Sequence, residues 1–223
     1  IADDFSLSAQ QQEIIGMSVF VCYALGSFIN GYLADHFGAK KIIIIGGLMT
    51  CIFNICIALG DDWTSVLLAQ GLNGYFQSMI WVGGVSLLAK WWKEGERGKG
   101  IGIANFFSGM SHTTAYLLPI VLMTLFHMSD WRSMFIAPIG VLFAFVIIFG
   151  LAAKESPESI GAEPYEIENE RHKQREQELN ELAKENKAPF LFLFRQKNFW
   201  WWCTVAMLSS ICRYGLLNWI PLY

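Results

Sequence analysis

Arg213 has the side chain with the clearest capacity to bind a ligand, because it lies deep inside a long apolar segment. The segment starts near Phe199, and at about 1.5 Å per helical residue Arg213 lies near the middle of a membrane. A charge at that depth is costly, usually faces a water-filled cavity and needs an anionic partner. Because a guanidinium binds carboxylate or phosphate through two parallel hydrogen bonds, Arg213 is predicted to bind an anionic substrate. A structural ion pair with a carboxylate elsewhere in the protein is the alternative.

Four polar residues, Asn105, Ser108, His112 and Tyr116, follow one another at spacings of three, four and four residues within another apolar segment. Helical periodicity places them on one face, one above another. Such a face in a membrane helix predicts the lining of a polar cavity, so the four residues are candidates for substrate binding. Hydrogen bonds between packed helices would explain the same pattern.

The elements that must position these residues are membrane-spanning helices. Of the 223 residues, 54% are hydrophobic and 16% are charged, whereas a soluble domain carries about 25% charged residues. Long apolar runs without period-two alternation predict helices rather than strands. The predicted fold class is therefore all-α, a polytopic membrane helical bundle. The predicted spans are approximately residues 14–34, 42–59, 64–89, 100–126, 134–153 and 199 onward.

A charged segment divides the predicted bundle. Residues 1–153 are expected to form an N-terminal membrane half with five spans, 154–198 a central loop with solvated charges, and 199–223 the truncated first helix of a C-terminal half. Lysines and arginines concentrate in this loop and in the turns near Lys40 and Lys90. These regions are therefore predicted to face the cytoplasm, with the chain in the cytoplasmic membrane. The first residues would then lie outside, which implies that a preceding helix is missing.

Several classes of function have no support in the sequence. The net charge is −3 and no basic stripe is present, so nucleic acid is not expected as a partner. The five cysteines lie in apolar segments without metal-ligand spacing, so neither a metal site nor a cofactor is expected. P-loop, H-E-x-x-H and G-x-S-x-G motifs are absent from the sequence. Neither an enzyme nor an ATP-driven pump is therefore predicted.

The turn between the first two spans carries a motif with a mechanical interpretation. It reads Gly31-Tyr-Leu-Ala-Asp35-His-Phe-Gly38-Ala-Lys40-Lys41. Gly31 would let helices approach closely, Asp35 would accept hydrogen bonds at a helix end, and Gly38 would allow a tight turn. The motif resembles the G-x-L-A-D-x-x-G-[RK]-[RK] loop between the second and third helices of the major facilitator superfamily. The resemblance implies that these residues act in conformational change.

The remaining sequence resembles the organophosphate:phosphate antiporters of that superfamily. The similarity rests on Gly71–Gln77 with Trp81, on Trp91-Trp92, on Asp130-Trp131-Arg132 and on Arg213-Tyr214-Gly215. It implies helices two to seven of a twelve-helix transporter, a partial major facilitator fold. Helix one and most of the C-terminal half would be partners supplied by the rest of the same chain. By this resemblance, Arg213 is one of two arginines that hold the substrate phosphate.

Three positions depart from the pattern of the glycerol-phosphate members of this family. Ser108 stands where they carry a substrate-site histidine, and His112 lies one turn further along. Asn218 replaces an aspartate of these members, and Ser27 stands where many members of the family carry a lysine, so two intramembrane charges are lost. Asn218 is nevertheless retained as a candidate substrate ligand beside Arg213. These departures leave specificity for sugar phosphates open.

The sequence therefore predicts a secondary active transporter of a small organic anion, with an organophosphate as the expected substrate. Transport would proceed by alternating access, through antiport with phosphate or ion coupling. The small anion and membrane lipid are the expected partners. A non-transporting membrane sensor of phosphorylated sugars, built on the same fold, is the alternative.

Overall fold

The computed structural model of the chain describes residues 5, 7–125, 131–161 and 197–219. Within these ranges every regular element is a helix, which confirms the all-α prediction. A long helix lies at each of the six predicted spans. The long helices are α1 (Ala9–Phe37), α2 (Ala39–Ala58), α3 (Trp63–Trp91), α4 (Arg97–Leu125), α5 (Trp131–Ala152) and α8 (Lys197–Trp219). Two short 3₁₀ helices are η1 (Glu94–Glu96) and η2 (Pro157–Ile160).

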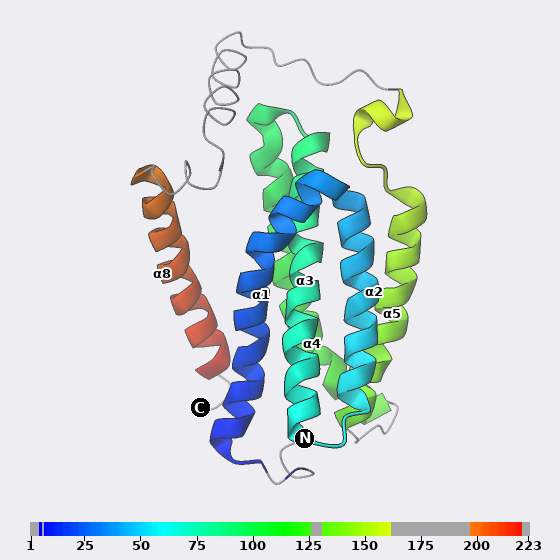
Figure 1. Cartoon of the computed structure of the whole chain (residues 1–223), viewed down its shortest axis with the longest axis vertical. Helices are drawn as coiled ribbons and strands as arrows, with labels where there is room; N and C mark the ends of the chain where they lie inside the picture. The colour runs from blue at the N-terminus through cyan, green and yellow to red at the C-terminus, as the bar shows by residue number, and fades with distance from the viewer. Residues whose placement is uncertain (1–4, 6, 126–130, 162–196, 220–223) are drawn as a thin grey trace. The chain divides into compact units, whose positions relative to one another are not determined.

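The chain divides into two compact units, Ile1–Tyr165 and Glu166–Tyr223. The first unit contains α1 to α5 and both short helices, and the second contains α8. The helices of the first unit run alongside one another, with the α1–α2 turn at the upper end in Figure 1. This upper end also carries the turn from α3 to α4 and the segment after α5. It is called the basic end below, because the lysines near positions 40 and 90 lie there.

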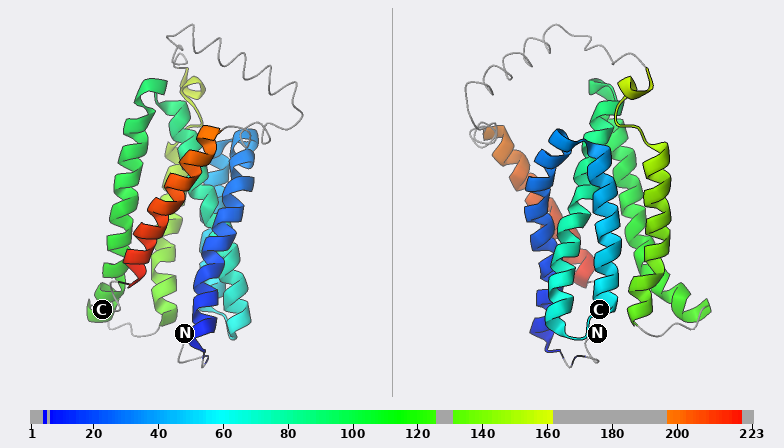
Figure 2. Two further views of the ribbon diagram at one scale, coloured as in Figure 1. Left: turned by 90° about the vertical axis from the view of Figure 1, so that its left-hand side faces the viewer. Right: turned by 45° about the vertical axis from the view of Figure 1, so that its right-hand side comes forward.

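Helix α3 organises the packing of the first unit, because it contacts both α1 and α2 (Figures 1 and 2). Helices α1 and α3 approach so closely that a Cβ at Gly74 would lie 2.4 Å from the carbonyl oxygen of Val19. Glycine is therefore needed there, as is common where membrane helices touch. Helix α5 packs along α2, whereas α4 meets α3 over a short stretch only.

The buried apolar side chains form two small clusters between these helices. Near the basic end, Ala34, Ile42 and Met79 bring α1, α2 and α3 together. Near the opposite end, the cluster consists of Ile57, Val66 and Ala69 from α2 and α3. Most other large apolar side chains point outward, as expected for helices whose solvent is lipid rather than water.

Hydropathy and length together identify four segments able to cross a membrane among the described residues. They are Gln10–Phe37, Ala39–Ala58, Arg97–Thr124 and Phe135–Ala152. Helix α3 has 29 residues and α8 has 23, so both are long enough, but neither contains an 18-residue stretch as apolar as those of the four segments. For α3 the physical reason is its position, because it packs against two helices and buries Asn73 and Ser78. The face of α3 that packs against these helices therefore does not need to match lipid.

Candidate functional site

A single residue, Gly38, joins α1 to α2 at the basic end. Its φ of 96° lies in the region that favours glycine, because other residues are strained there. A Cβ at this position would also lie 3.3 Å from Oε2 of Glu155. The glycine of the sequence motif therefore serves both the turn and the close approach of a carboxylate.

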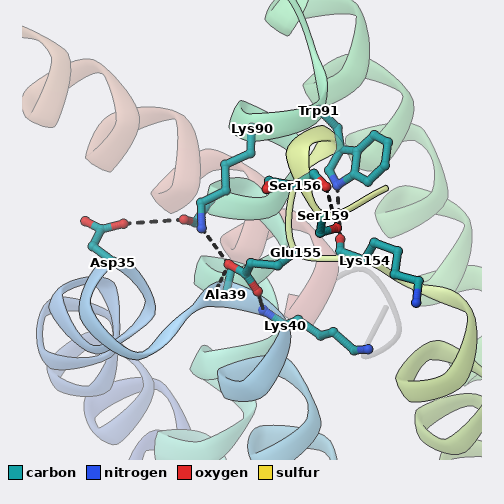
Figure 3. Close-up of polar contacts among 10 residues, drawn as sticks. Asp35, Ala39, Lys40, Lys90, Trp91, Lys154, Glu155, Ser156 and Ser159 are labelled. Atoms are coloured by element: carbon teal, nitrogen blue, oxygen red, sulfur yellow. Dashed lines mark hydrogen bonds and ion pairs between the residues drawn. The ribbon is translucent and has the colours of Figure 1, made fainter. Parts of the chain in front are cut away.

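Glu155 follows the end of α5 and binds the beginning of α2. Its Oε1 accepts a hydrogen bond of 2.8 Å from the N–H of Ala39, and its Oε2 accepts one of 2.8 Å from the N–H of Lys40 (Figure 3). The first N–H groups of a helix have no partner within the helix, and the positive end of the helix dipole attracts an anion. Glu155 thus caps α2 from a segment more than 100 residues further along the chain.

Lys90, in the last turn of α3, forms an ion pair with the same carboxylate, with Nζ 2.5 Å from Oε1. Burial raises the pKa of Glu155, but the hydrogen bonds from Lys90 and from the N–H groups of Lys40 and Ala39 outweigh it. The pKa of Glu155 therefore lies below its ordinary value of 4.5, and the side chain is an anion at neutral pH. One carboxylate consequently ties α2, α3 and the end of α5 together.

Two further contacts complete this group, called the basic junction below. The hydroxyl of Ser86 on α3 donates a long hydrogen bond of 3.4 Å to Asp35 of α1. The indole N–H of Trp91 donates one of 3.1 Å to the carbonyl oxygen of Lys154 (Figure 3). The basic junction is defined by five residues, Asp35, Gly38, Lys90, Trp91 and Glu155.

The other residues of the sequence motif have less specific surroundings. A Cβ at Gly31 would meet Val82 at 3.7 Å, which is an ordinary contact. A methyl group would therefore fit at Gly31, whereas the tightest approaches of α1 to α3 lie at Gly26 and Gly74. The side chain of Lys40 points away from Glu155 in Figure 3, and Lys41 is exposed.

The predicted polar face of α4 exists as a helical face. Asn105, Ser108, His112 and Tyr116 all belong to the continuous helix α4. Asn105 is exposed and Ser108 is half-buried. The side chains of His112 and Tyr116 lie outside the described residues. Among the described residues, α4 has few contacts with the other helices of the first unit.

Arg213 and Asn218 both belong to α8, in the second compact unit. Their side chains also lie outside the described residues. The role of the six candidate ligands in anion binding therefore stays a prediction.

Sequence reasoning missed the polar contacts of Lys90 and Glu155. The central loop was expected to carry solvated charges, and this expectation is wrong for Glu155. The available signal was its position, three residues after the last residue of α5. A carboxylate there can reach the end of a neighbouring helix, although the sequence does not say which helix.

Comparisons with known proteins match the chain along its whole length. The family profile described as Major Facilitator Superfamily matches residues 1–223. A "Probable hexose phosphate transport protein" of Chlamydia trachomatis is 25% identical over 99% of this chain and 50% of its own length. The "Glycerol-3-phosphate transporter" of Bacillus subtilis is 26% identical over 92% of this chain and 47% of its own length. The "Hexuronate transporter" of Bacillus subtilis is 24% identical over 100% of this chain and 50% of its own length. The chain thus spans about half the length of the curated relatives it matches.

Proposed function

The chain belongs to the Major Facilitator Superfamily and is a multi-pass membrane protein, and from that premise we propose that the whole protein is a secondary active transporter of a small organic anion. An organophosphate is the proposed substrate class, because two of the relatives above are named for phosphorylated compounds. The third is named for hexuronates, which are carboxylates. All three substrate names describe anions.

The observation that carries the proposal is an arginine within a long helix that we expect to cross the membrane, in a chain whose relatives are named as transporters of anions. Arg213 belongs to the continuous helix α8. A guanidinium inside a membrane needs an anionic partner, and it matches a phosphate in a two-pronged geometry. In this proposal Arg213, Asn218 and the polar face of α4 each contribute ligands to the anion.

Alternating access would expose this anion site to one side of the membrane and then to the other. In this proposal the motif of Gly31, Asp35, Gly38, Lys40 and Lys41 acts at the basic end during that change. The exposed Asp35, whose contact with Ser86 is long, is the group of the motif best placed to exchange partners. Antiport with phosphate is the proposed coupling, and ion coupling is the alternative.

Uptake by the full-length protein in sealed vesicles tests the proposal. Labelled glycerol-3-phosphate and glucose-6-phosphate should accumulate faster than labelled glucuronate, and faster still when the vesicles are preloaded with phosphate. Faster uptake of glucuronate would move the substrate class to carboxylates. Saturable binding of a sugar phosphate without any uptake would instead support the sensor hypothesis.

A further inference from the structure

The end of α2 opposite the basic end is also held by a charged residue of α5. Arg132, the second residue of α5, donates hydrogen bonds through Nε to the carbonyl oxygen of Ala58, at 2.9 Å, and through Nη2 to that of Gly60, at 3.2 Å. Ala58 is the last residue of α2. The last carbonyls of a helix have no partner within the helix, and the negative end of the helix dipole attracts a cation. Arg132 therefore caps the C-terminus of α2.

Helix α5, through Arg132, and the segment after it, through Glu155, thus supply opposite charges to the two ends of α2. The carboxylate of Glu155 lies at the N-terminus and the guanidinium of Arg132 lies at the C-terminus, and each charge complements the dipole of α2. The lengths of the helices match, since α2 has 20 residues and α5 has 22. Both caps can consequently form together only when the antiparallel helices are in one register.

The surface between the two caps is apolar. An added Cβ at Gly47 would lie 2.4 Å from Cγ2 of Val146, so the helices pack closely there, and one at Gly150 would lie 3.5 Å from the Ile44 side chain. In lipid, apolar surfaces gain little by leaving the solvent, so packing and polar contacts must specify how helices associate. We propose that Arg132 and Glu155 act as paired end caps that fix the register of α2 against α5 and keep the two helices together as one body.

A double-mutant cycle on the full-length protein tests whether the two caps act together. The ends of α2 are about 30 Å apart at ~1.5 Å per residue, and substitutions at such distances usually have additive effects. If either cap alone can hold the pair, Arg132→Gln and Glu155→Gln should each lower the Tm modestly. The double variant should then lower the Tm by clearly more than the sum. Additive shifts would overturn the proposal.

Lys99→Gln combined with Glu155→Gln is the matched control. Lys99 forms an exposed pair with Glu96 three residues away, with Nζ 2.8 Å from Oε1, and takes no part in the caps. Its effect should be small and additive. An excess loss in this control as well would show that any second charge change weakens the Glu155→Gln protein, which also overturns the proposal.

Cysteine cross-linking reads the register directly and remains informative if the double variant is only partly stable. In a background without native cysteines, Ile44→Cys should cross-link with Gly150→Cys, because a Cβ at Gly150 lies 3.5 Å from the Ile44 side chain. A cross-link from Ile44→Cys to Val146→Cys, one turn away, should appear only when both caps are removed. An unchanged pattern would overturn the proposal. Neither measurement depends on transport, so a failure of the proposed function would not affect this test.

Discussion

The basic junction and the predicted anion site are both polar regions of an apolar bundle, and they differ in how their polar groups are partnered. At the junction, the Glu155 carboxylate accepts two backbone hydrogen bonds and pairs with Lys90. On α4, Asn105 is exposed, and its helix has few contacts within the first unit. The first pattern is typical of residues that hold helices together. The second is expected of residues that bind a ligand or contact another part of the protein.

This difference predicts two kinds of mutational effect. Removing one partner from a satisfied group leaves a polar atom without its hydrogen bond in the folded state, and this lowers stability. Removing a side chain that meets a ligand changes affinity and leaves the free protein folded. Thermal stability and substrate affinity, measured together on the full-length protein, should therefore separate the two regions.

The largest effect on affinity is expected for Arg213→Lys. Lysine keeps the charge but loses the two-pronged geometry, so the substrate should bind more weakly. A charge-assisted hydrogen bond is worth roughly 1.5–3 kcal/mol, which corresponds to about a ten- to hundredfold loss of affinity with the Tm nearly unchanged. Glycerol-3-phosphate binding measured by calorimetry gives the affinity, and a thermal-shift assay gives the Tm.

The alternative interpretation of Arg213 predicts the opposite pattern. In a structural ion pair, lysine can satisfy the carboxylate, so Arg213→Lys would bind substrate normally. Arg213→Ala would then leave a carboxylate alone in the membrane, and the whole bundle would lose stability. This pair of results would show that Arg213 stabilises the bundle, as the residues of the basic junction do, and does not bind the substrate.

The next effect concerns the packing of α1 on α3, which supports the junction. Gly74→Ala places a Cβ 2.4 Å from the backbone oxygen of Val19, so the helices must move apart. Overpacking of this kind costs about 1–3 kcal/mol, and the Tm should fall by several degrees. Gly84→Ala on the same helix is the matched control, because no atom lies within 4 Å of its Cβ. That variant should keep or slightly raise the Tm, since alanine favours helix.

Glu155→Gln should lower stability by a smaller amount, of about 1–2 kcal/mol. Glutamine can keep one hydrogen bond to α2 but loses the ion pair and the favourable interaction with the helix dipole. The lower magnitude reflects the 34% exposure of the Glu155 side chain. Glu96→Gln is the control, because Glu96 is an exposed carboxylate paired locally with Lys99. Equal Tm shifts for the two variants would show that the cap at α2 contributes no more to stability than an exposed ion pair does.

The pH dependence of stability also tests whether the Glu155 carboxylate stabilises the folded protein. The folded-state pKa of Glu155 is lowered below 4.5, so its contribution is fully present above that pH. It should be lost as the pH falls from 4.5 through the lower folded-state value. The Tm of the parent protein should therefore fall more steeply than that of Glu155→Gln on acidification, and the two should converge at the acid end. Parallel curves would contradict the assignment of this carboxylate.

The fold was largely predictable from the sequence, because long apolar runs without period-two alternation form α-helices in a membrane. Each predicted span coincides with a helix, and Gly38 forms the tight turn that the motif indicated. Contacts between distant segments were not predictable in the same way. The capping of α2 by Glu155 joins residues 115 and 116 positions apart, and no local pattern encodes that distance.

Glycine positions show the same limit. The sequence motif suggested Gly31 as the point of close helix approach, but the space beside it would accept a methyl group. Gly74, which belongs to no turn motif, is one of the positions where helix backbones approach closely. Which glycine on a helix is needed depends on the crossing point with its neighbour, and the sequence of a single helix does not contain that information.

The smallest effect is expected on the polar face of α4. Asn105→Ala removes a neutral side chain, and a neutral hydrogen bond is worth about 0.5–1.5 kcal/mol, so substrate affinity should fall by roughly two- to tenfold at most. The Tm should not change, because Asn105 is exposed in the first unit. Thr114→Ala is the matched control, since Thr114 is exposed on the opposite side of α4 and bonds only to the Met110 carbonyl oxygen of its own helix among the contacts described. A lower Tm with unchanged affinity for Asn105→Ala would identify this face as a helix–helix contact. The polar residues of α4 would then stabilise the bundle, as those of the basic junction do, and would not bind the substrate.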